Sequence, residues 1–272
     1  MLTSTETRAL LEKLGHRPRQ PLGQNFLIEK NIVEKQCRMA GLKAGDTVVE
    51  IGPGLGTLTL ALLKAGAQVF AIELDKRLAA HLRETLCVTY RDTMHLLEGD
   101  AVNNPLAGLP QNIEGDFKII ANLPYAITSP WIDAVLQGPL PERMVLMVQK
   151  EAADRLCASP GTKAFSALSI FLQSAYRLEV THRVSKQCFY PAPDVDSALI
   201  TLVRQERPFS FSAEVRAVIS MFFQQRRKQI GTLCKQQKQE ALMAWLHEAG
   251  IPENTRPEAI AIEHWQRLKA SR

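Results

Sequence analysis

Short apolar runs alternate with helical stretches from residue 46 onward, and this alternation is the feature that most restricts the fold. A strand-length run followed by a helix and another strand predicts a right-handed crossover between parallel strands. Strands of this kind are expected at 47–52, 68–75, 94–101, 117–122 and 143–149. We therefore expect an α/β fold with a mostly parallel, Rossmann-like sheet, which segments 176–184 and 197–205 can extend as an antiparallel pair.

The chain changes character after Arg207 and Pro208. Segments 212–234, 239–250 and 256–270 carry apolar residues at helical spacing, with Gly and Pro between the segments. This pattern predicts a small all-helical domain at the C-terminal end. We expect three parts: an N-terminal arm and helix over 1–45, the Rossmann-like domain over 46–206, and the helical domain over 207–272.

Positive charge is concentrated in the expected helical domain. Residues 1–203 contain 21 Lys/Arg and 21 Asp/Glu, whereas residues 204–272 contain 12 and 7. A basic segment favours a polyanionic partner such as a nucleic acid. Arg226, Arg227 and Lys228, on an expected helix, are candidates for neutralising nucleic-acid phosphates, and the basic segment 17–20 is another. A solvated helix face and a mobile arm are the respective alternatives.

Several classes of protein are disfavoured by composition. No apolar run approaches the ~20 residues needed to span a bilayer. The first residues lack the apolar segment of a secretory signal, and Glu6 and Glu12 interrupt any mitochondrial presequence. The five cysteines are odd in number and scattered, with no C-x-x-C pair, which argues against a disulfide framework or a structural zinc. We expect a cytoplasmic protein with reduced thiols, no membrane segment and no metal.

Glycines and polar residues follow the expected strands where each strand ends. Gly52 and Gly54 lie in the turn after the first strand, where the missing Cβ lets backbone approach a ligand. Glu73 ends the second strand and can accept both hydroxyls of a ribose. Asp100 follows the third and can accept from the amine of an adenine ring. Ligands of open α/β sheets bind at this edge, so we expect these residues and Asn122 to converge, although each alone is an ordinary turn or cap residue.

The fourth expected strand ends in Asn122-Leu123-Pro124-Tyr125. Asn and Pro break strands, so a simple turn is one interpretation of this tetrapeptide. The other is a ligand site, because an amide, a rigid residue and an aromatic ring follow the strand at the edge where ligands bind.

Motifs in a fixed order carry a resemblance to a known family. "EIGPGLGTLT" (50–59), "IELD" (72–75), "GDA" (99–101) and "NLPY" (122–125) are similar to S-adenosylmethionine-dependent N6-adenine methyltransferases. Further motifs resemble the ribosomal small-subunit (16S) RNA adenine dimethyltransferases: "LGQNFL" (22–27), "VQKEAADRL" (148–156), "FYPAPDVDSA" (189–198) and "FFQQRRKQIGTL" (222–233). The resemblance covers nearly the whole chain. It implies a class I methyltransferase sheet, S-adenosylmethionine as cofactor, and the RNA of an immature 30S subunit as partner.

The tetrapeptide then has a chemical role. The amine on adenine C6 is a poor nucleophile, because its lone pair is delocalised into the ring. Acceptors for both N–H groups favour a pyramidal nitrogen, and the Asn122 side chain and the Leu123 carbonyl are the expected acceptors. Pro124 holds Leu123 extended, and Tyr125 offers a face on which the base stacks. We expect these residues to position the amine for in-line attack on the methyl group, without metal or covalent intermediate.

The resemblance assigns further residues. It places Phe189 on the other side of the base, for which a core phenylalanine is the alternative. It also implies that Asn25 and Leu27 contact the methionine part of the cofactor. Because the target atom must leave its stack, base flipping or an unpaired loop is expected.

Competing functions are separated by these motifs. The resemblance favours N6,N6-dimethylation of two adjacent adenines in the 3′-terminal hairpin loop of small-subunit RNA. A macrolide-resistance methyltransferase acting on large-subunit RNA is one alternative, and a small-subunit assembly factor without chemistry is another. An NAD-dependent dehydrogenase is disfavoured, because "NLPY" has no role there. Nothing in the chain demands a dimer, so we expect a monomer.

Overall fold

The computed structural model describes residues 2–19, 23–110, 115–237 and 240–269. The chain forms two compact units, one of Met1–Ala153 and Leu178–Arg204, the other of Asp154–Arg177 and Gln205–Arg272. The domain boundaries expected after residues 45 and 206 stay predictions about independent folding, which compactness alone does not test. Gln20 and Leu22, which belong to two of the motifs above, lie outside the described residues.

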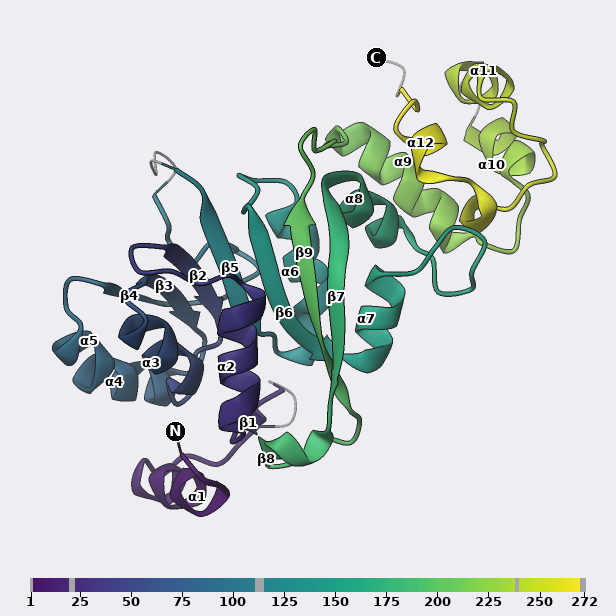
Figure 1. Cartoon of the computed structure of the whole chain (residues 1–272). Coiled ribbons are helices and arrows are strands. Elements are labelled where there is room, and N and C mark those ends of the chain that lie inside the picture. Colours follow the sequence, from purple (N-terminus) through teal and green to yellow (C-terminus); the bar gives the residue numbers. More distant parts are fainter. Residues whose placement is uncertain (1, 20–22, 111–114, 238–239, 270–272) are drawn as a thin grey trace. The chain divides into compact units, whose positions relative to one another are not determined.

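A sheet of seven strands within the described residues forms the centre of the first unit (Figure 1). The strand order is β4-β3-β2-β5-β6-β9-β7. Neighbours from β4 to β6 are parallel, and β9 runs antiparallel to β6. The expected α/β fold with a mostly parallel sheet is therefore confirmed. The strands are β2 (Thr47–Ile51), β3 (Gln68–Glu73), β4 (Met94–Glu98), β5 (Phe117–Asn122), β6 (Arg143–Gln149), β7 (Tyr176–Val184) and β9 (Ser197–Arg204).

Helices cover both faces of this sheet, with α2 in front and α6 behind in Figure 1. Because both faces are covered, the central strands are buried almost throughout, which explains their nearly continuous apolar sequences. The helices outside the C-terminal segment are α1 (Ser4–Lys13), α2 (Lys30–Met39), α3 (Thr57–Lys64), α4 (Lys76–Glu84), α5 (Leu86–Thr89), α6 (Thr128–Val135) and α7 (Lys150–Leu156).

A second, two-stranded sheet joins segments from opposite ends of the first unit. β1 (Phe26–Leu27) pairs antiparallel with β8 (Phe189–Tyr190), so that Phe26 faces Tyr190 and Leu27 faces Phe189. Two of the motifs that carry the family resemblance are thus adjacent in space. No local sequence pattern predicts this pairing, since each strand is only two residues long.

The second unit is helical, as expected, but its helices are shorter than the sequence pattern predicts. It contains α8 (Ala167–Ala175), α9 (Ala213–Gln224), α10 (Ile230–Gln237), α11 (Glu240–Glu248), the 3-10 turn η4 (Pro257–Ala259) and α12 (Ile262–Trp265). The segment 212–234, expected to be helical throughout, is broken between α9 and α10. The break begins at Gln225, whose φ of −115° and ψ of 38° leave the helical region. The polar run 224–229 has no apolar face to bury, so packing does not support a helix there, although Gln, Arg and Lys have high helix propensity.

An aromatic cluster forms the core of the second unit. The Trp265 ring lies 5.2 Å from Trp245, 6.2 Å from Phe222 and 6.0 Å from Phe223, between ring centroids. These residues come from α9, α11 and α12, so the cluster joins helices that are separate in sequence.

Candidate functional site

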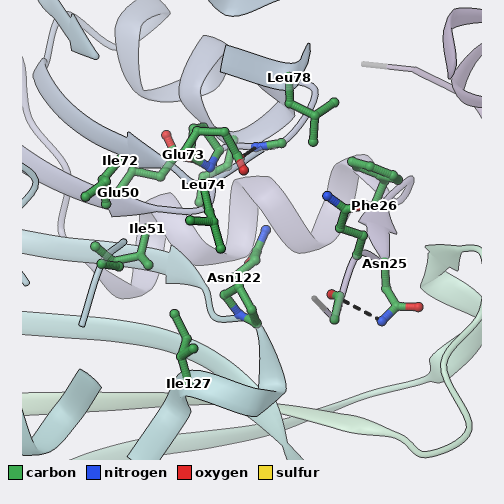
Figure 2. Close-up of a pocket in the computed structure, with 18 of the residues that line it drawn as sticks. Asn25, Phe26, Glu50, Ile51, Ile72, Glu73, Leu74, Leu78, Asn122 and Ile127 are labelled. Atoms are coloured by element: carbon green, nitrogen blue, oxygen red, sulfur yellow. Dashed lines mark hydrogen bonds between the residues drawn. The ribbon is translucent and has the colours of Figure 1, made fainter. Parts of the chain in front are cut away.

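A pocket opens at the carboxyl ends of the parallel strands, the position expected from the sequence (Figure 2). Its walls come from the ends of β2, β3, β4 and β5 and from the segment that leads into β1. Every residue that the sequence assigned to a cofactor lines it: Asn25, Leu27, Gly52, Gly54, Glu73, Asp100 and Asn122. Convergence of these groups is therefore a feature of the structure, while their individual roles stay predictions.

Glu73 occupies the end of β3 with its carboxylate held by backbone donors. Its side chain is 6% exposed, and it accepts hydrogen bonds from the N–H groups of Gly54 (3.0 Å) and Asp75 (2.9 Å). Burial raises the pKa of this carboxyl, and the two hydrogen bonds oppose that rise. The group is fixed in orientation before any ligand arrives.

Gly54 is required by the close approach of β1. Its φ of +60° lies in the left-handed region, and a Cβ placed on it would lie 3.2 Å from a ring carbon of Phe26. A side chain at this position would therefore strain the backbone and would require the Phe26 ring to shift by a few tenths of an ångström. The glycine turn thus packs against Phe26 of β1.

Asp100 follows β4 and is half-buried at the pocket wall. Its Oδ1 accepts from the Val102 N–H at 2.8 Å, and its Oδ2 accepts from the Asn103 side chain at 3.4 Å. The carboxylate can still take a further hydrogen bond, because its two oxygens offer about four acceptor positions.

Glu50 also lines the pocket, although it is not among the residues expected there from the sequence. It lies in β2, is 2% exposed, and its Oε2 has no hydrogen-bond partner within the described part of the chain. Burial raises the pKa of this carboxyl to about 8; hydrogen bonding with Thr59 opposes the rise, and the nearby Glu73 carboxylate adds to it. A carboxylate within an otherwise apolar strand, directly before the glycine turn, was the available sequence signal.

The NLPY turn (residues 122–125) begins where β5 ends. Asn122 is half-buried at the pocket wall, and its Oδ1 accepts a hydrogen bond of 2.7 Å from the Nε2 of Gln36. The buried Leu123 is anchored by its N–H, which donates to the Met147 carbonyl at 3.0 Å. Pro124 lines the pocket.

Tyr125 and Leu123, unlike Asn122 and Pro124, are not among the residues that line the pocket. Tyr125 begins the 3-10 turn η2 (Tyr125–Ile127), and its hydroxyl lies 2.7 Å from Ser197 Oγ, with either atom able to donate. Burial raises the pKa of the Tyr125 phenol. The hydroxyl end of the Tyr125 ring is thereby anchored to Ser197, the first residue of β9.

The N-terminal motif packs directly against the NLPY turn. A Cβ added to Gly23, whose φ is +63°, would lie 3.1 Å from the Tyr125 nitrogen and 3.4 Å from the Pro124 Cα. Asn25 donates from Nδ2 to the Gly23 carbonyl at 3.4 Å and faces the pocket (Figure 2). The segment around Asn25 therefore joins the cofactor region to the turn expected to hold the target base.

Phe189 lies in a different environment from the other expected catalytic residues. It is 6% exposed, pairs with Leu27 and packs in a hydrophobic cluster with it, and it does not line the pocket. This is the placement of a core phenylalanine, the alternative given above. Its contact with a base stays a prediction.

Arg226, Arg227 and Lys228, the basic turn, lie between α9 and α10 and not on a helix, so that expectation is wrong. Arg226 donates to the Lys163 carbonyl at 2.8 Å, and Lys228 donates to Gln236 at 3.2 Å. Arg227 and Lys228 are exposed. A turn places such side chains outward in several directions, which still suits contact with phosphates.

Two further features concern what the described residues do not contain. None of their helices is long and apolar enough to cross a membrane. In the same part of the chain, no three His, Cys, Asp or Glu side chains gather as a metal site would require.

The family model and the most similar sequences point to the same kind of protein. The family described as "Ribosomal RNA adenine dimethylase" matches residues 15–271. Ribosomal RNA small subunit methyltransferase A of Opitutus terrae is 57% identical over 271 residues, which cover 98% of this chain and 98% of the relative. The protein of the same name from Anoxybacillus flavithermus is 40% identical over 279 residues, covering 98% of this chain and 94% of the relative.

Solved structures agree with the sequence relatives. A dimethyladenosine transferase from Plasmodium falciparum superimposes with a TM-score of 0.73 at 26% identity, covering 89% of this chain and 95% of that one. The 23S rRNA methyltransferase ErmE superimposes with a TM-score of 0.65 at 25% identity, covering 90% of this chain and 98% of that one. The fold and the resemblance expected from the motifs are confirmed. With a family match over nearly its whole length and such a relative, the chain belongs to the ribosomal RNA adenine dimethylase family.

Proposed function

We propose that this enzyme dimethylates the N6 amines of two adjacent adenines in the 3′-terminal hairpin loop of 16S ribosomal RNA during assembly of the 30S subunit. It is a ribosomal RNA adenine dimethyltransferase, and its cofactor is S-adenosylmethionine. The observation that carries the choice of the small subunit is the 57% identity, across 98% of both chains, with a relative named for that subunit.

The pocket has the groups that the cofactor requires. When bound, S-adenosylmethionine supplies an electrophilic methyl group on a sulfonium. Glu73, preoriented by two backbone donors, would accept from the ribose hydroxyls, and Asp100 would accept from the adenine amine. Asn25 and Leu27 would contact the methionine part from the opposite wall, with Gly52 and Gly54 allowing backbone close to the ligand. The pocket suits this cofactor because carboxylates and glycines from the ends of neighbouring strands line it.

The NLPY turn would hold the nucleophile. Asn122 at the pocket wall and the carbonyl of the anchored Leu123 would accept from the two N–H groups of the target amine. Neither acceptor is a base at neutral pH, so their contribution is to orient the nitrogen lone pair toward the methyl group. Tyr125, tethered through its hydroxyl to Ser197, would offer its ring for stacking, a contact worth about 1–3 kcal/mol. Phe189 would contribute the second face only on moving out of its cluster.

RNA binding would involve the basic turn. Arg227 and Lys228 are exposed, and each phosphate that such a side chain neutralises makes binding more dependent on salt. We also propose that the protein acts as a monomer in the cytoplasm on the immature 30S particle.

The test is transfer of labelled methyl from S-adenosylmethionine to ribosomal particles that lack adenine methylation. Small subunits, large subunits and free small-subunit RNA are incubated with the wild-type protein and with Asn122→Ala. We expect label on small-subunit adenines, lost in the variant, with dimethyladenosine as the product after digestion. Positions of the label are then mapped along the RNA.

Each alternative has its own outcome. ErmE resembles the chain over 90% of its length, so label on large-subunit RNA would replace the proposal with a large-subunit function. Tight binding to small subunits without any label would instead indicate an assembly factor that has lost its chemistry. Unchanged transfer by Asn122→Ala would refute the role of the NLPY turn while leaving the substrate assignment intact.

A further inference from the structure

Gln36 is a fully buried polar residue in a helix that faces the sheet. It lies on α2 (Lys30–Met39), where the buried positions are Val33 and Gln36, and its exposed fraction is 0%. An amide removed from water needs hydrogen-bond partners, because a buried amide without them destabilises the fold. The partner of this side chain is therefore informative.

The side chain of Gln36 donates to the side chain of Asn122. The distance from Gln36 Nε2 to Asn122 Oδ1 is 2.7 Å, the short end of the range for such bonds. The Oε1 of Gln36 has no partner in the described part of the chain. Within the described residues, the side-chain hydrogen bond that Gln36 makes is thus directed at the residue expected to hold the target amine.

This contact selects which end of the Asn122 amide is an acceptor. A carboxamide can rotate so that its N–H₂ and its oxygen exchange places, and an N–H₂ group facing the substrate would repel an amine that must donate. In the structure Gln36 presents its N–H₂ end to Asn122, which keeps the Asn122 oxygen at that position. Reversing both amides together would exchange donor and acceptor, so a variant at position 36 that can only accept should turn the Asn122 amide round. A carbonyl oxygen accepts two hydrogen bonds, so one remains for the substrate after Gln36 has taken the other.

We propose that Gln36 is a positioning residue that locks the Asn122 carboxamide in its acceptor orientation for the target amine. This inference rests on the role of Asn122 under the proposed function. Gln36 lies on α2 and does not line the pocket, so it would affect the substrate only through Asn122 at the end of β5. Pre-orientation lowers the barrier because the amide need not reorganise when the base enters.

Two substitutions at position 36 separate positioning from packing. Gln36→Met retains length and fills the space but cannot donate. Gln36→Glu can donate only while it is protonated, and burial is expected to raise the pKa of the new carboxyl. Val33→Ala, on the same buried face of α2, is the matched control for loss of stability without a contact to Asn122.

We expect Gln36→Met to lower kcat about 10- to 100-fold, the effect of a misplaced reacting group, with unchanged affinity for S-adenosylmethionine. In an Asn122→Ala background the same change should have no further effect, since the group that it orients is gone. Gln36→Glu should approach wild-type kcat at low pH, where the new carboxyl is protonated and can donate. Its kcat relative to wild type should fall as the pH rises and the carboxyl ionises. Val33→Ala should keep kcat while lowering the unfolding temperature.

A readout independent of turnover is the side-chain N–H₂ signal of Asn122 in a nitrogen-15 NMR spectrum, assigned by its loss in Asn122→Ala. Gln36→Met should shift and broaden this signal, whereas Val33→Ala should not. An unchanged signal, an additive effect in the Asn122→Ala background, or full activity of Gln36→Glu at high pH would each overturn the proposal. Failure of the wild-type protein to transfer methyl would refute the proposed function, while the NMR result would still decide the orientation of Asn122.

Discussion

Replacing Glu50 with glutamine should make the protein more stable at neutral pH, although it removes an ionisable side chain from the ligand pocket. Glu50 is 2% exposed and its Oε2 has no partner within the described residues. Burial raises its pKa from 4.5 to about 8, with Glu73 contributing. Glu50→Gln preserves the shape of the side chain and abolishes its ionisation.

The effect depends on pH in a defined direction. Below pH 4.5, the unfolded pKa, Glu50 is protonated in both the folded and the unfolded protein, and the folded protein has its full stability. As pH rises toward 8, the unfolded chain releases a proton that the folded protein retains, so stability is lost. That loss reaches about 3 kcal/mol at pH 7 and about 5 kcal/mol above the folded pKa. The glutamine amide needs hydrogen-bond partners of its own, so we expect a net gain of about 2 kcal/mol at pH 7.

Thermal unfolding followed by circular dichroism at about pH 4.5, 7 and 8.5 measures this gain. For a chain of this length, about 2 kcal/mol corresponds to a rise in Tm of about 4 to 8 °C at pH 7, with little or no gain near pH 4.5. Glu84→Gln, which replaces an exposed carboxyl on α4, is the control and should leave Tm unchanged. A pH-independent shift, or a loss of stability at pH 8.5, would show that Glu50 is ionised and satisfied in the folded protein.

Further expected outcomes concern the cofactor, the substrate, the RNA and the fold. Glu73→Ala should weaken binding of S-adenosylmethionine about 10- to 100-fold in titration calorimetry, because a preoriented acceptor is lost, whereas unchanged affinity would contradict the ribose assignment. Asn122→Ala should keep that affinity and lose most turnover, and a parallel loss of both would place Asn122 on the cofactor alone. Neutralising all three residues of the basic turn should lower the slope of log affinity against log salt by about 2, and an unchanged slope would return them to solvated surface. The Lys118 side chain is 7% exposed and its Nζ lies 2.6 Å from Asp46 Oδ2. Lys118→Met leaves that carboxylate without its partner, so the free energy of unfolding measured with urea should fall by about 1–3 kcal/mol; equal stability would show that the ion pair is not needed.

The architecture of the site was predictable where a single strand end carries the information. Gly52, Glu73, Asp100 and Asn122 each lie at or just beyond the end of a strand, and parallel strands bring their carboxyl ends to one edge. Their convergence in one pocket therefore follows from periodicity and strand order. Pairing of β1 with β8 was not predictable, since two-residue strands have no periodicity and their contact depends on the completed sheet.

Other features depended on surroundings that a linear pattern does not contain. Gln36 appears in sequence as one polar residue of an amphipathic helix, and only the packed structure shows that it faces Asn122. Apolar residues on both sides of the basic turn suggested a continuous helix, while the polar run 224–229 between them ends it. The sequence around Phe189 does not distinguish a ring that packs in the core from one that faces a ligand. Its burial in the structure shows that the ring packs in the core.

The charges of the pocket explain why an amide rather than a carboxylate belongs at position 122. Glu50 and Glu73 already line the pocket, and their proximity raises the pKa of Glu50 further than burial alone. A third carboxylate would add repulsion and would take up a proton, which turns an acceptor into a donor. Asn122 accepts from an amine without titrating, but its neutrality leaves the two ends of the amide nearly equal in size and energy. A second neutral amide, Gln36, donates to the Asn122 oxygen at 2.7 Å without adding charge, and this is the contact that we propose holds the orientation of Asn122. The buried Gln36 and Asn122, the acceptor that we propose for the target amine, thus both satisfy the same electrostatic constraint.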